Sequence, residues 1–293
     1  MDITIVCIPY QMDMARWGYA LGPQALLDHG LISELEQRGH QVRPPIWIEL
    51  PSSERTRDTV TNLGRIASRS AAAASEALRR ENSIVLLLEG DCTHAVGAIG
   101  GLAQALGRPG VVWFDAHGDL NTRATSSSGY WGGMPYAVAL GWDLEDWRLA
   151  AGLEPALRPE AAALIGTSDL DPPEQAALQQ HPIWHLEAKE MLEPGVAARI
   201  QAGLRPRAPN AAAWYLHIDL DVAGPEEVPG GLTPAPYWPP RAHLIEAAGA
   251  AAQAVPVRAY SLAVYDPRGD PTRRGAQFAI EMALAVLGGI EKK

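Results

Sequence analysis

The chain has 293 residues, of which 47% are hydrophobic and 20% are charged, and its formal net charge is −10. This acidic balance argues against a nucleic-acid or anionic-membrane surface, because binding to phosphates normally requires clustered Lys and Arg. The sequence shows neither a long apolar span nor a basic-then-apolar leader, so we expect a cytoplasmic protein that does not enter a membrane. A small ligand, including a cationic one, fits this charge balance better.

Strand-length apolar runs alternate with helix-like segments along the chain. The runs are ITIVCI (3–8), SIVLLLEG (83–90), GVVWFDAHGD (110–119), AAALIG (161–166), AAAWYLHIDLDV (211–222) and AYSLAVYD (259–266). Helix-like segments cover 23–39, 65–80 and 187–204. This alternation predicts an α/β fold of three αβα layers, with a mostly parallel sheet flanked by helices on both faces. The length allows one large core, so we expect residues 1–293 to form a single domain.

The least regular segment is NTRATSSSGYWGGMP (121–135). Its Ser, Thr and Gly content disfavours regular structure and predicts a loop or lid. In open α/β sheets, ligands bind beyond the carboxyl ends of the strands. Polar residues at those ends are therefore the candidates for a functional site.

Two cysteines, Cys7 and Cys92, are too few for a disulfide framework. We interpret Cys7 as a buried thiol. Cys92 lies in EGDCTHAVG (89–97), where a predicted strand gives way to a helix. Gly90, Asp91 and Cys92 also resemble a nucleophile elbow in which Cys92 would attack an acyl carbon, although His94 stands where that motif has its closing Gly.

Acidic residues follow two of the predicted strands. Asp115, His117 and Asp119 alternate along VVWFDAHGD, so an extended backbone would point all three to one face. The run YLHIDLDV repeats the pattern with Asp219 and Asp221. Four converging carboxylates would repel one another unless cations compensated them, and carboxylates with one imidazole suit Mn²⁺ or Mg²⁺. The alternative is that these acids cap the following helices or pair with Arg; the repeat of one motif on two strands favours metal.

The motifs EGDCTHAVG, FDAHGDLNT and HIDLDV together resemble the three signature motifs of the arginase and agmatinase (ureohydrolase) family. The resemblance extends in the same order over nearly the whole chain, including GYALGPQALLDHGLISELEQRGHQV near the N-terminus. It implies an arginase-like fold and a hydrolase with a binuclear manganese centre. It also implies a homo-oligomer, a trimer or a hexamer.

The resemblance implies a ligand set for two divalent ions. Asp115 and Asp219 would bridge the two ions, and Asp119 would complete the first together with a residue of EGDCTHAVG. The second ion would take the remaining two ligands, His117 and Asp221. Where the family has His after Gly-Asp, this chain has Cys92, and a thiolate favours Zn²⁺ or Co²⁺ over Mn²⁺. We expect His94 to have a packing or supporting role, with direct ligation left open.

The resemblance also implies a substrate-binding side. Asn121 and Ser128 match positions that hold the α-carboxylate of arginine in arginases, and Asp169, Asp171 and Glu174 match those around its α-amino group. Hydroxyl and amide donors with an acid suit a zwitterionic amino acid. The alternative is that the first two are ordinary loop residues and that the acids shape a turn before Pro172.

Two departures from the family bear on activity. Gly132 stands where the family has a His assigned to proton transfer, and Val264 stands where arginases grip the guanidinium with a Glu. Tyr265 and Asp266 are nearby polar candidates for that second role. Gly224 replaces an Asp that usually supports the centre.

We therefore expect a metal-dependent hydrolase of a guanidino or amidino C–N bond in an arginine-like, including N-hydroxylated, substrate. Asp119 would pass a proton to the leaving amine, since the His is missing. The alternative is a catalytically impaired relative that acts as a binding or regulatory protein. Retention of the Asp and His ligands favours the hydrolase, because four mutually repelling acids have no other need to stay together.

Overall fold

The computed structural model describes residues 1–231 and 235–292. Its strands are β1 (Asp2–Ile8), β2 (Tyr10–Gln11), β3 (Met14–Ala15), β4 (Gln41–Val42), β5 (Ile46–Trp47), β6 (Ser83–Glu89), β7 (Pro109–Phe114), β8 (Ala162–Thr167), β9 (Trp184–Glu187), β10 (Ala213–Ile218) and β11 (Val257–Leu262). Its α-helices are α1 (Gly22–Asp28), α2 (Leu31–Gln37), α3 (Thr59–Leu78), α4 (Ala95–Leu106), α5 (Pro135–Ala139), α6 (Glu145–Ala150), α7 (Pro172–Gln180), α8 (Val196–Leu204), α9 (Arg241–Ala254) and α10 (Arg274–Glu291).

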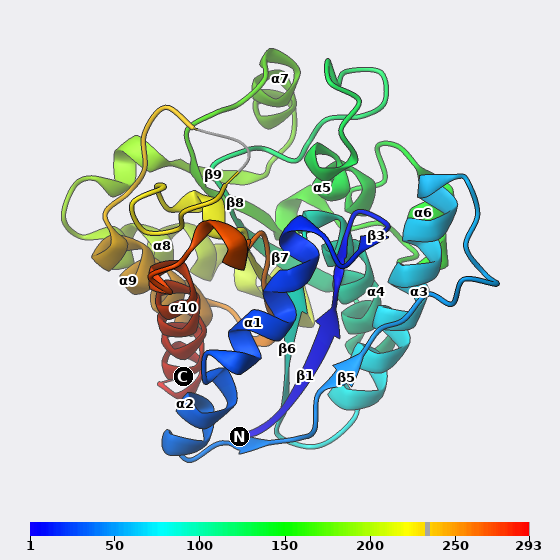
Figure 1. Ribbon diagram of the computed structural model, residues 1–293. Helices are drawn as coiled ribbons and strands as arrows, with labels where there is room; N and C mark the ends of the chain where they lie inside the picture. Colours follow the sequence, from blue (N-terminus) through cyan, green and yellow to red (C-terminus); the bar gives the residue numbers. More distant parts are fainter. Residues whose placement is uncertain (232–234, 293) are drawn as a thin grey trace.

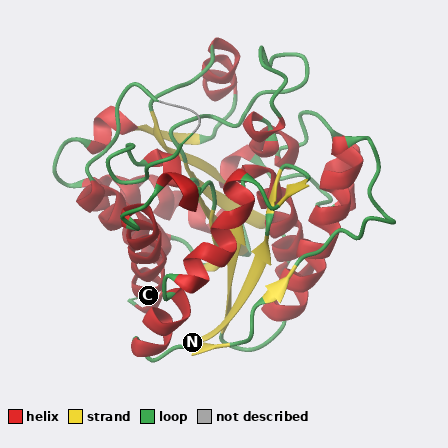
Figure 2. Cartoon of the chain, in the orientation of Figure 1, coloured by secondary structure: helices red, strands yellow, loops and turns green. Residues whose placement is uncertain are grey.

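One parallel sheet forms the centre of the fold, in the order β4-β1-β6-β11-β10-β7-β8-β9, with β5 also pairing with β1. Helices lie on both sides of it (Figure 2). Strands β2 and β3 form a separate antiparallel hairpin. The predicted three-layer αβα architecture with a mostly parallel sheet is confirmed.

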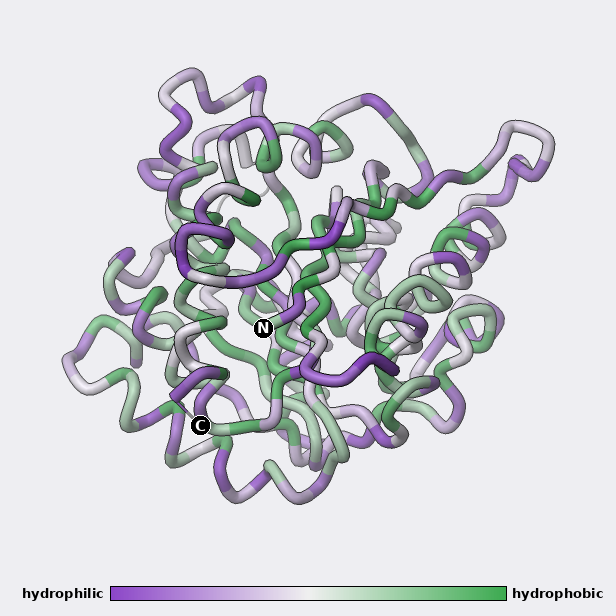
Figure 3. The backbone as a smooth tube through the Cα atoms, turned by 90° about the horizontal axis from the view of Figure 1, so that it is seen from below, coloured by the Kyte–Doolittle hydropathy of each residue, from purple (hydrophilic) through white to green (hydrophobic). Residues whose placement is uncertain are grey.

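The two faces of the sheet are built by the alternation of side chains along each strand. In β1, Ile3 and Ile5 belong to the core cluster shared with α1, α2, α8, α9 and α10, whereas Val6 and Ile8 belong to the cluster shared with α3, α4 and α5. These two helical layers stand on opposite sides of the strands in Figure 1. Figure 3 shows hydrophobic segments gathered toward the middle and hydrophilic ones on the outer loops.

Two of the predicted helices are interrupted. The segment 23–39 is split into α1 and α2 at Gly30, whose φ of 93° leaves the helical region. The segment 187–204 is helical in α8 but begins with the end of β9 and a 3-10 turn (Ala188–Met191), and the left-handed Gly195 precedes α8. Composition alone missed both breaks. The segment 121–135 is a loop with a 3-10 turn at Trp131–Gly133, as predicted.

The carboxyl ends of the strands meet at one edge of the sheet, and β6, β11, β10 and β7 are consecutive neighbours there. Loops, the segment 121–135 and α7 cover this edge at the top of Figure 1. None of the helices in the described ranges combines the length and hydropathy needed to cross a membrane.

Candidate metal centre

The turn after β6 places the Cys92 side chain at the edge of the sheet. A Cβ on Gly90 would lie 1.9 Å from the Tyr10 carbonyl oxygen, so the chain needs glycine there to pass this backbone. The Asp91 carboxylate accepts hydrogen bonds from the backbone N–H of Met12, at 2.6 Å, and of Thr93, at 3.1 Å. These contacts hold the 3-10 turn Cys92–His94 in place.

His94 lies away from the acidic cluster. Its Nε2 is 2.8 Å from the Tyr10 carbonyl oxygen and 3.7 Å from Asp91 Oδ1. The ring is buried and packs edge-on against the Tyr10 ring. The packing role predicted for His94 agrees with this position, and direct ligation does not.

The three polar residues after β7 converge by a different route from the predicted one. The strand ends at Phe114, and the chain then bends, with Asp119 in the left-handed region at φ 53°. Extended alternation therefore does not align Asp115, His117 and Asp119, and that part of the prediction was wrong. The Asp115 carboxylate caps this bend, since the His117 backbone N–H donates to its Oδ1 at 2.8 Å.

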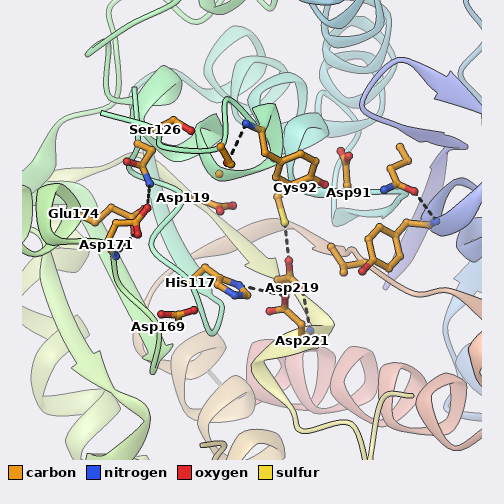
Figure 4. Close-up of a pocket in the computed structure, with 18 residues that line it drawn as sticks. Asp91, Cys92, His117, Asp119, Ser126, Asp169, Asp171, Glu174, Asp219 and Asp221 are labelled. Atoms are coloured by element: carbon orange, nitrogen blue, oxygen red, sulfur yellow. Dashed lines mark hydrogen bonds and ion pairs between the residues drawn. The ribbon is translucent and has the colours of Figure 1, made fainter. Parts of the chain in front are cut away.

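The end of β10 supplies the other two acids. Asp219 caps the 3-10 turn Leu220–Val222, because its Oδ1 accepts the Asp221 backbone N–H at 2.8 Å. Its Oδ2 faces Cys92 Sγ at 2.8 Å. The capping alternative is thus correct for one oxygen of Asp219, while the other oxygen faces the cluster. Figure 4 shows the thiol pointing at this carboxylate.

Five of these six side chains form two groups of potential ligands that share the Asp115 carboxylate, and Asp219 belongs to neither group. Ligand atoms of Cys92, Asp115 and Asp119 lie within 4.8 Å of one another, and so do those of Asp115, His117 and Asp221. His117 Nδ1 is 3.2 Å from Asp115 Oδ1 and 3.3 Å from Asp221 Oδ2. One carboxylate shared by two groups is what adjacent sites for two ions require.

The electrostatics of the cluster favour bound cations. Burial, reinforced by the charge of Asp221, raises the pKa of Asp115 to about 6. Burial and neighbouring acids also raise the pKa values of Asp119 and Asp219 well above the ordinary range. Asp119 Oδ2 is buried without a hydrogen-bond partner among the described residues. A cation would compensate the charge and give this oxygen a partner, so the donor set fits divalent metal.

Cys92 is protonated when no cation is bound, because burial and the charges of Asp219 and Asp119 raise the pKa of its thiol well above the ordinary value. An activated cysteine nucleophile requires the opposite shift and a nearby base. The thiol instead donates to a carboxylate. This geometry disfavours the nucleophile-elbow alternative.

A cavity of about 540 Å³ opens over the cluster, which is large enough for an amino-acid-sized ligand. The predicted substrate-side residues Asn121, Ser128, Asp169, Asp171 and Glu174 all line it, together with Cys92, His117, Asp119, Asp219 and Asp221. In Figure 4, Asp171 and Glu174 lie across the cavity from Asp91. The structure thus brings the two predicted halves of the site to one cavity.

Several substrate-side residues also hold the scaffold. Asp171 and Glu174 form the capping box of α7, and Glu174 Oε1 accepts the Leu120 backbone N–H at 3.0 Å. Burial raises the pKa of Glu174 to about 7 despite these backbone bonds. Asn121 donates to Asp171 Oδ2 at 2.9 Å and accepts from Thr125 Oγ1 at 2.9 Å. Their contact with substrate stays a prediction.

The departures from the family motifs also fall at the cavity. Gly132 and Val264 line it, and Val264 has a φ of 66°, which is rare for a β-branched residue. Tyr265 donates to Asp270 at 3.1 Å, and Asp266 pairs with Arg268 at 2.7 Å. Neither Tyr265 nor Asp266 lines the cavity, so neither replaces the missing guanidinium partner.

Sequence reasoning missed two groups around the centre. Gln11, Tyr19 and Tyr130 line the cavity, although none of them was predicted as a site residue. Trp113 donates from Nε1 to Asp115 Oδ2 at 3.1 Å and packs in a tilted arrangement against His217, with 4.0 Å between ring centroids. The polar residues inside apolar strands were the available signal, because a buried polar group needs a partner.

His217 belongs to a fully buried polar network beneath the cluster. Its Nδ1 is 3.0 Å from the Tyr215 hydroxyl and 2.9 Å from Ser261 Oγ. The Tyr215 hydroxyl also lies 3.3 Å from Glu89 Oε2. The carboxyl ends of β6, β11 and β10 are therefore tied together by side chains as well as by the backbone ladder.

The fold and the cavity define a class: an α/β protein with a candidate binuclear metal centre at the carboxyl edge of a parallel sheet. The model of the Arginase family matches residues 1–288. The arginase of Bacillus caldovelox is 30% identical over 238 residues, which cover 79% of this chain and 80% of that protein. This chain belongs to the Arginase family.

Solved structures agree with the family assignment. The crystal structure of arginase from Bacillus subtilis superposes with a TM-score of 0.88 at 27% identity, covering 98% of this chain and 99% of that one. Formimidoylglutamase from Bacillus subtilis superposes with a TM-score of 0.78 at 19% identity, covering 99% of this chain and 87% of that one. At 19% identity the likeness shows the fold alone.

Proposed function

We propose that this chain is a binuclear metal-dependent ureohydrolase that cleaves a guanidino or amidino C–N bond in an arginine-like amino acid, including one with an N-hydroxylated guanidino group. The products would be an amine and urea or a urea analogue. The observation that carries the proposal is the pair of ligand groups that share Asp115 beneath an amino-acid-sized cavity.

Two divalent ions would be held by Cys92, Asp115, His117, Asp119, Asp219 and Asp221. Manganese is the ion that the family resemblance implies, and the Cys92 thiolate would also accept Zn²⁺ or Co²⁺. When bound, such ions supply Lewis acidity that lowers the pKa of a water molecule and polarises the substrate. The protein contributes ligands whose positions are already fixed by backbone caps at Asp115 and Asp219.

We assign the role of proton carrier to Asp119. It lines the cavity, and its Oδ2 has no partner in the part of the chain that the structure describes. Water would attack the guanidino carbon and lose a proton to Asp119, and the C–N bond would break with its electron pair going to the leaving nitrogen. Asp119 would then give the proton to that nitrogen, which closes the proton balance.

The substrate half of the cavity favours a zwitterionic amino acid. Asn121 and Ser128 offer amide and hydroxyl groups, and Asp169 and Asp171 offer carboxylates for an ammonium group. A fully cationic guanidinium would lie beside the apolar side chain of Val264, where a carboxylate would bind it more strongly. A hydroxylated guanidino group is less basic and is therefore neutral more often, so it needs a carboxylate partner less than arginine does and suits this cavity better.

Reconstitution with Mn²⁺, Zn²⁺ or Co²⁺, followed by assays of urea and hydroxyurea release, tests the proposal. L-arginine, N-hydroxy-L-arginine and agmatine are the substrates to compare. We expect release from N-hydroxy-L-arginine at the highest rate and the weakest turnover of agmatine, which lacks the carboxylate. Absence of release from all three by protein that holds two ions would favour the second candidate function.

That second candidate is a catalytically impaired relative that binds an amino acid or regulates a partner. The thiol hydrogen bond between Cys92 and Asp219 favours it, because binding of the first ion must displace that proton. A homo-oligomer is a further prediction from the family resemblance, and a cytoplasmic location is a further prediction from the sequence. Light scattering during size exclusion would distinguish a trimer or hexamer from a monomer.

A further inference from the structure

The ring of Tyr130 fills the space beside Gly132. A Cβ built on Gly132 would lie 2.2 Å from Tyr130 Cε1 and 2.8 Å from its hydroxyl oxygen. Any side chain at position 132 would therefore have to displace this ring. The position where the family resemblance expects a proton-transferring His is thus occupied in space by a phenol from two residues earlier.

The Tyr130 side chain lies at the candidate metal centre. Tyr130 lines the same cavity as Cys92 and Asp119. The side chain is 36% exposed. Partial burial of the phenol, reinforced by nearby Asp91 and Cys92, raises its pKa, so the group stays a neutral hydrogen-bond donor. The Tyr130 backbone N–H donates to Ser128 Oγ at 3.2 Å, and the Asn121 backbone N–H donates to the Gly133 carbonyl oxygen at 3.1 Å, which ties the two ends of the loop together.

We propose that Tyr130 is a catalytic residue whose hydroxyl donates a hydrogen bond to the nitrogen that leaves when the guanidino C–N bond breaks. This inference rests on the proposed function. In the bound guanidino group the nitrogen lone pairs are delocalised, so those nitrogens accept hydrogen bonds poorly. As the bond breaks, the leaving nitrogen recovers its lone pair and becomes an acceptor.

The hydrogen bond therefore forms mainly in the transition state, where it raises kcat and not ground-state affinity. Proton transfer itself stays with Asp119, which takes a proton from the attacking water and gives it to the leaving amine. Tyr130 keeps its own proton throughout. Its contribution is a preorganised donor at the place where negative charge develops.

Tyr130→Phe tests the hydroxyl, because it keeps the ring and removes the donor. We expect kcat with N-hydroxy-L-arginine to fall about 100-fold, as for the loss of one preorganised donor. KM and the bound metal per chain should stay within about twofold of wild type. Tyr237→Phe is the matched control, since Tyr237 has the same 36% exposure as Tyr130 but lies outside this cavity.

Gly132→Ala tests the steric half of the inference. The added Cβ should drive the phenol out of the cavity and lower kcat to the level of Tyr130→Phe. The double variant should be no slower than either single variant, because both changes remove the same hydroxyl from the same place. A crystal structure of Gly132→Ala should show the Tyr130 ring displaced.

The outcomes separate this inference from the proposed function. Wild-type protein with two ions and no turnover of guanidino compounds overturns both. An active wild type whose Tyr130→Phe variant keeps its kcat, or loses its bound metal, overturns the role of Tyr130 alone. Additive losses in Tyr130→Phe and Gly132→Ala, or an undisplaced ring in the Gly132→Ala crystal, would also overturn it.

Discussion

The thiol of Cys92 and the Oδ2 atom of Asp219 are 2.8 Å apart, although the two residues are 127 positions apart in the chain. The ends of β6 and β10 bring them together across β11. If both groups bind the first ion as proposed, that ion has to replace their S–H to carboxylate hydrogen bond. Under the proposed function, the same contact would stabilise the metal-free centre and compete with the first ion.

Metal stoichiometry should reveal this competition. We expect about two Mn²⁺ or Zn²⁺ per native chain after reconstitution, with about one ion lost in Cys92→Ala because a ligand is missing. Cys92→His should restore the second ion and shift the preference toward Mn²⁺, since imidazole is less selective for soft metals than thiolate. Elemental analysis of desalted protein is the measurement.

Cys7→Ala is the matched control for this experiment, because Cys7 is buried in β1 and belongs to neither ligand group. It should leave the metal content unchanged. Native protein with one ion or none, together with a gain in Cys92→His, would mean that the first site has decayed. The binding or regulatory candidate would then become the better account of the chain.

Gly90 should be irreplaceable for packing reasons. Gly90→Ala places a methyl group 1.9 Å from the Tyr10 carbonyl oxygen, and backbone cannot move aside as a flexible side chain can. We expect a loss of about 3 kcal/mol or more in the free energy of unfolding, measured by urea denaturation. Gly288→Ala in α10 is the control, since its Cβ would meet nothing within 4 Å.

Gly288→Ala should be neutral or slightly stabilising, because alanine has the higher helix propensity. Equal stability of the two variants would contradict the close approach at Gly90. If Gly90→Ala keeps its stability but loses bound metal, the turn after β6 has changed its conformation to relieve the clash while the rest of the fold is unchanged.

The sequence was enough to predict the sheet and the edge where the acidic side chains gather, because both depend on local patterns. The assignment of these acids as metal ligands stays a prediction. Apolar runs mark the strands, and acids directly after them mark the carboxyl edge. The reason given for the convergence of Asp115, His117 and Asp119 was nevertheless wrong, because the chain bends after Phe114 and Asp119 takes a positive φ. A bend of this kind is set by tertiary contacts and leaves no periodic signal.

Tyr130 shows a second limit of the sequence. The motif indicated the missing His at Gly132, but not that the ring two positions earlier occupies the vacated space. Such exchange between neighbouring positions depends on the path of an irregular loop. The network around His217 was also missed, because its members come from β6, β10 and β11 and share no motif.

Asn121 should contribute to recognition of the amino-acid end of the substrate. Its amide is held in place by Asp171 and Thr125, which leaves one amide hydrogen for a ligand carboxylate. Asn121→Ala should raise KM for N-hydroxy-L-arginine about tenfold, consistent with the loss of one hydrogen bond to a charged group. Steady-state kinetics should show little change with agmatine.

An equal rise in KM for both substrates in Asn121→Ala would mean that the residue supports the loop and does not bind the carboxylate of the substrate. Thr122→Ala is a suitable control from the same loop, because Thr122 does not line the cavity.

Asp143 should make the stability of the 121–135 loop dependent on acid pH. Hydrogen bonds from Arg123 lower the folded-state pKa of Asp143 to about 2 from 3.8. Its stabilising contribution is therefore fully present above about pH 4 and is lost as the pH falls through about 2. Asp143→Asn should lower Tm by about 2–4 °C at pH 7, and the difference should vanish near pH 2.

Arg123→Ala should produce the same loss of Tm at pH 7 and should not add to Asp143→Asn, because both changes remove one ion pair. Calorimetry across this pH range is the measurement. A difference between wild type and Asp143→Asn that persists at pH 2 would mean that the ion pair with Arg123 does not account for the effect.

Asp119→Asn separates the two roles assigned to Asp119, ligand and proton carrier. An amide can still offer an oxygen to a metal ion but cannot take a proton from water. At Mn²⁺ concentrations that keep two ions bound, we expect kcat to fall at least about 100-fold while KM changes little. Elemental analysis of the assayed protein must accompany the kinetics.

Asp169→Asn is the comparison, because Asp169 lines the substrate side of the same cavity and belongs to neither ligand group. This substitution should raise KM and leave kcat within a few-fold of the wild-type value. It removes a charge that would contribute equally to binding in the ground state and in the transition state. Normal turnover by Asp119→Asn with two ions bound would remove Asp119 from the proton path. The proton for the leaving amine would then have to come from another group that lines the cavity.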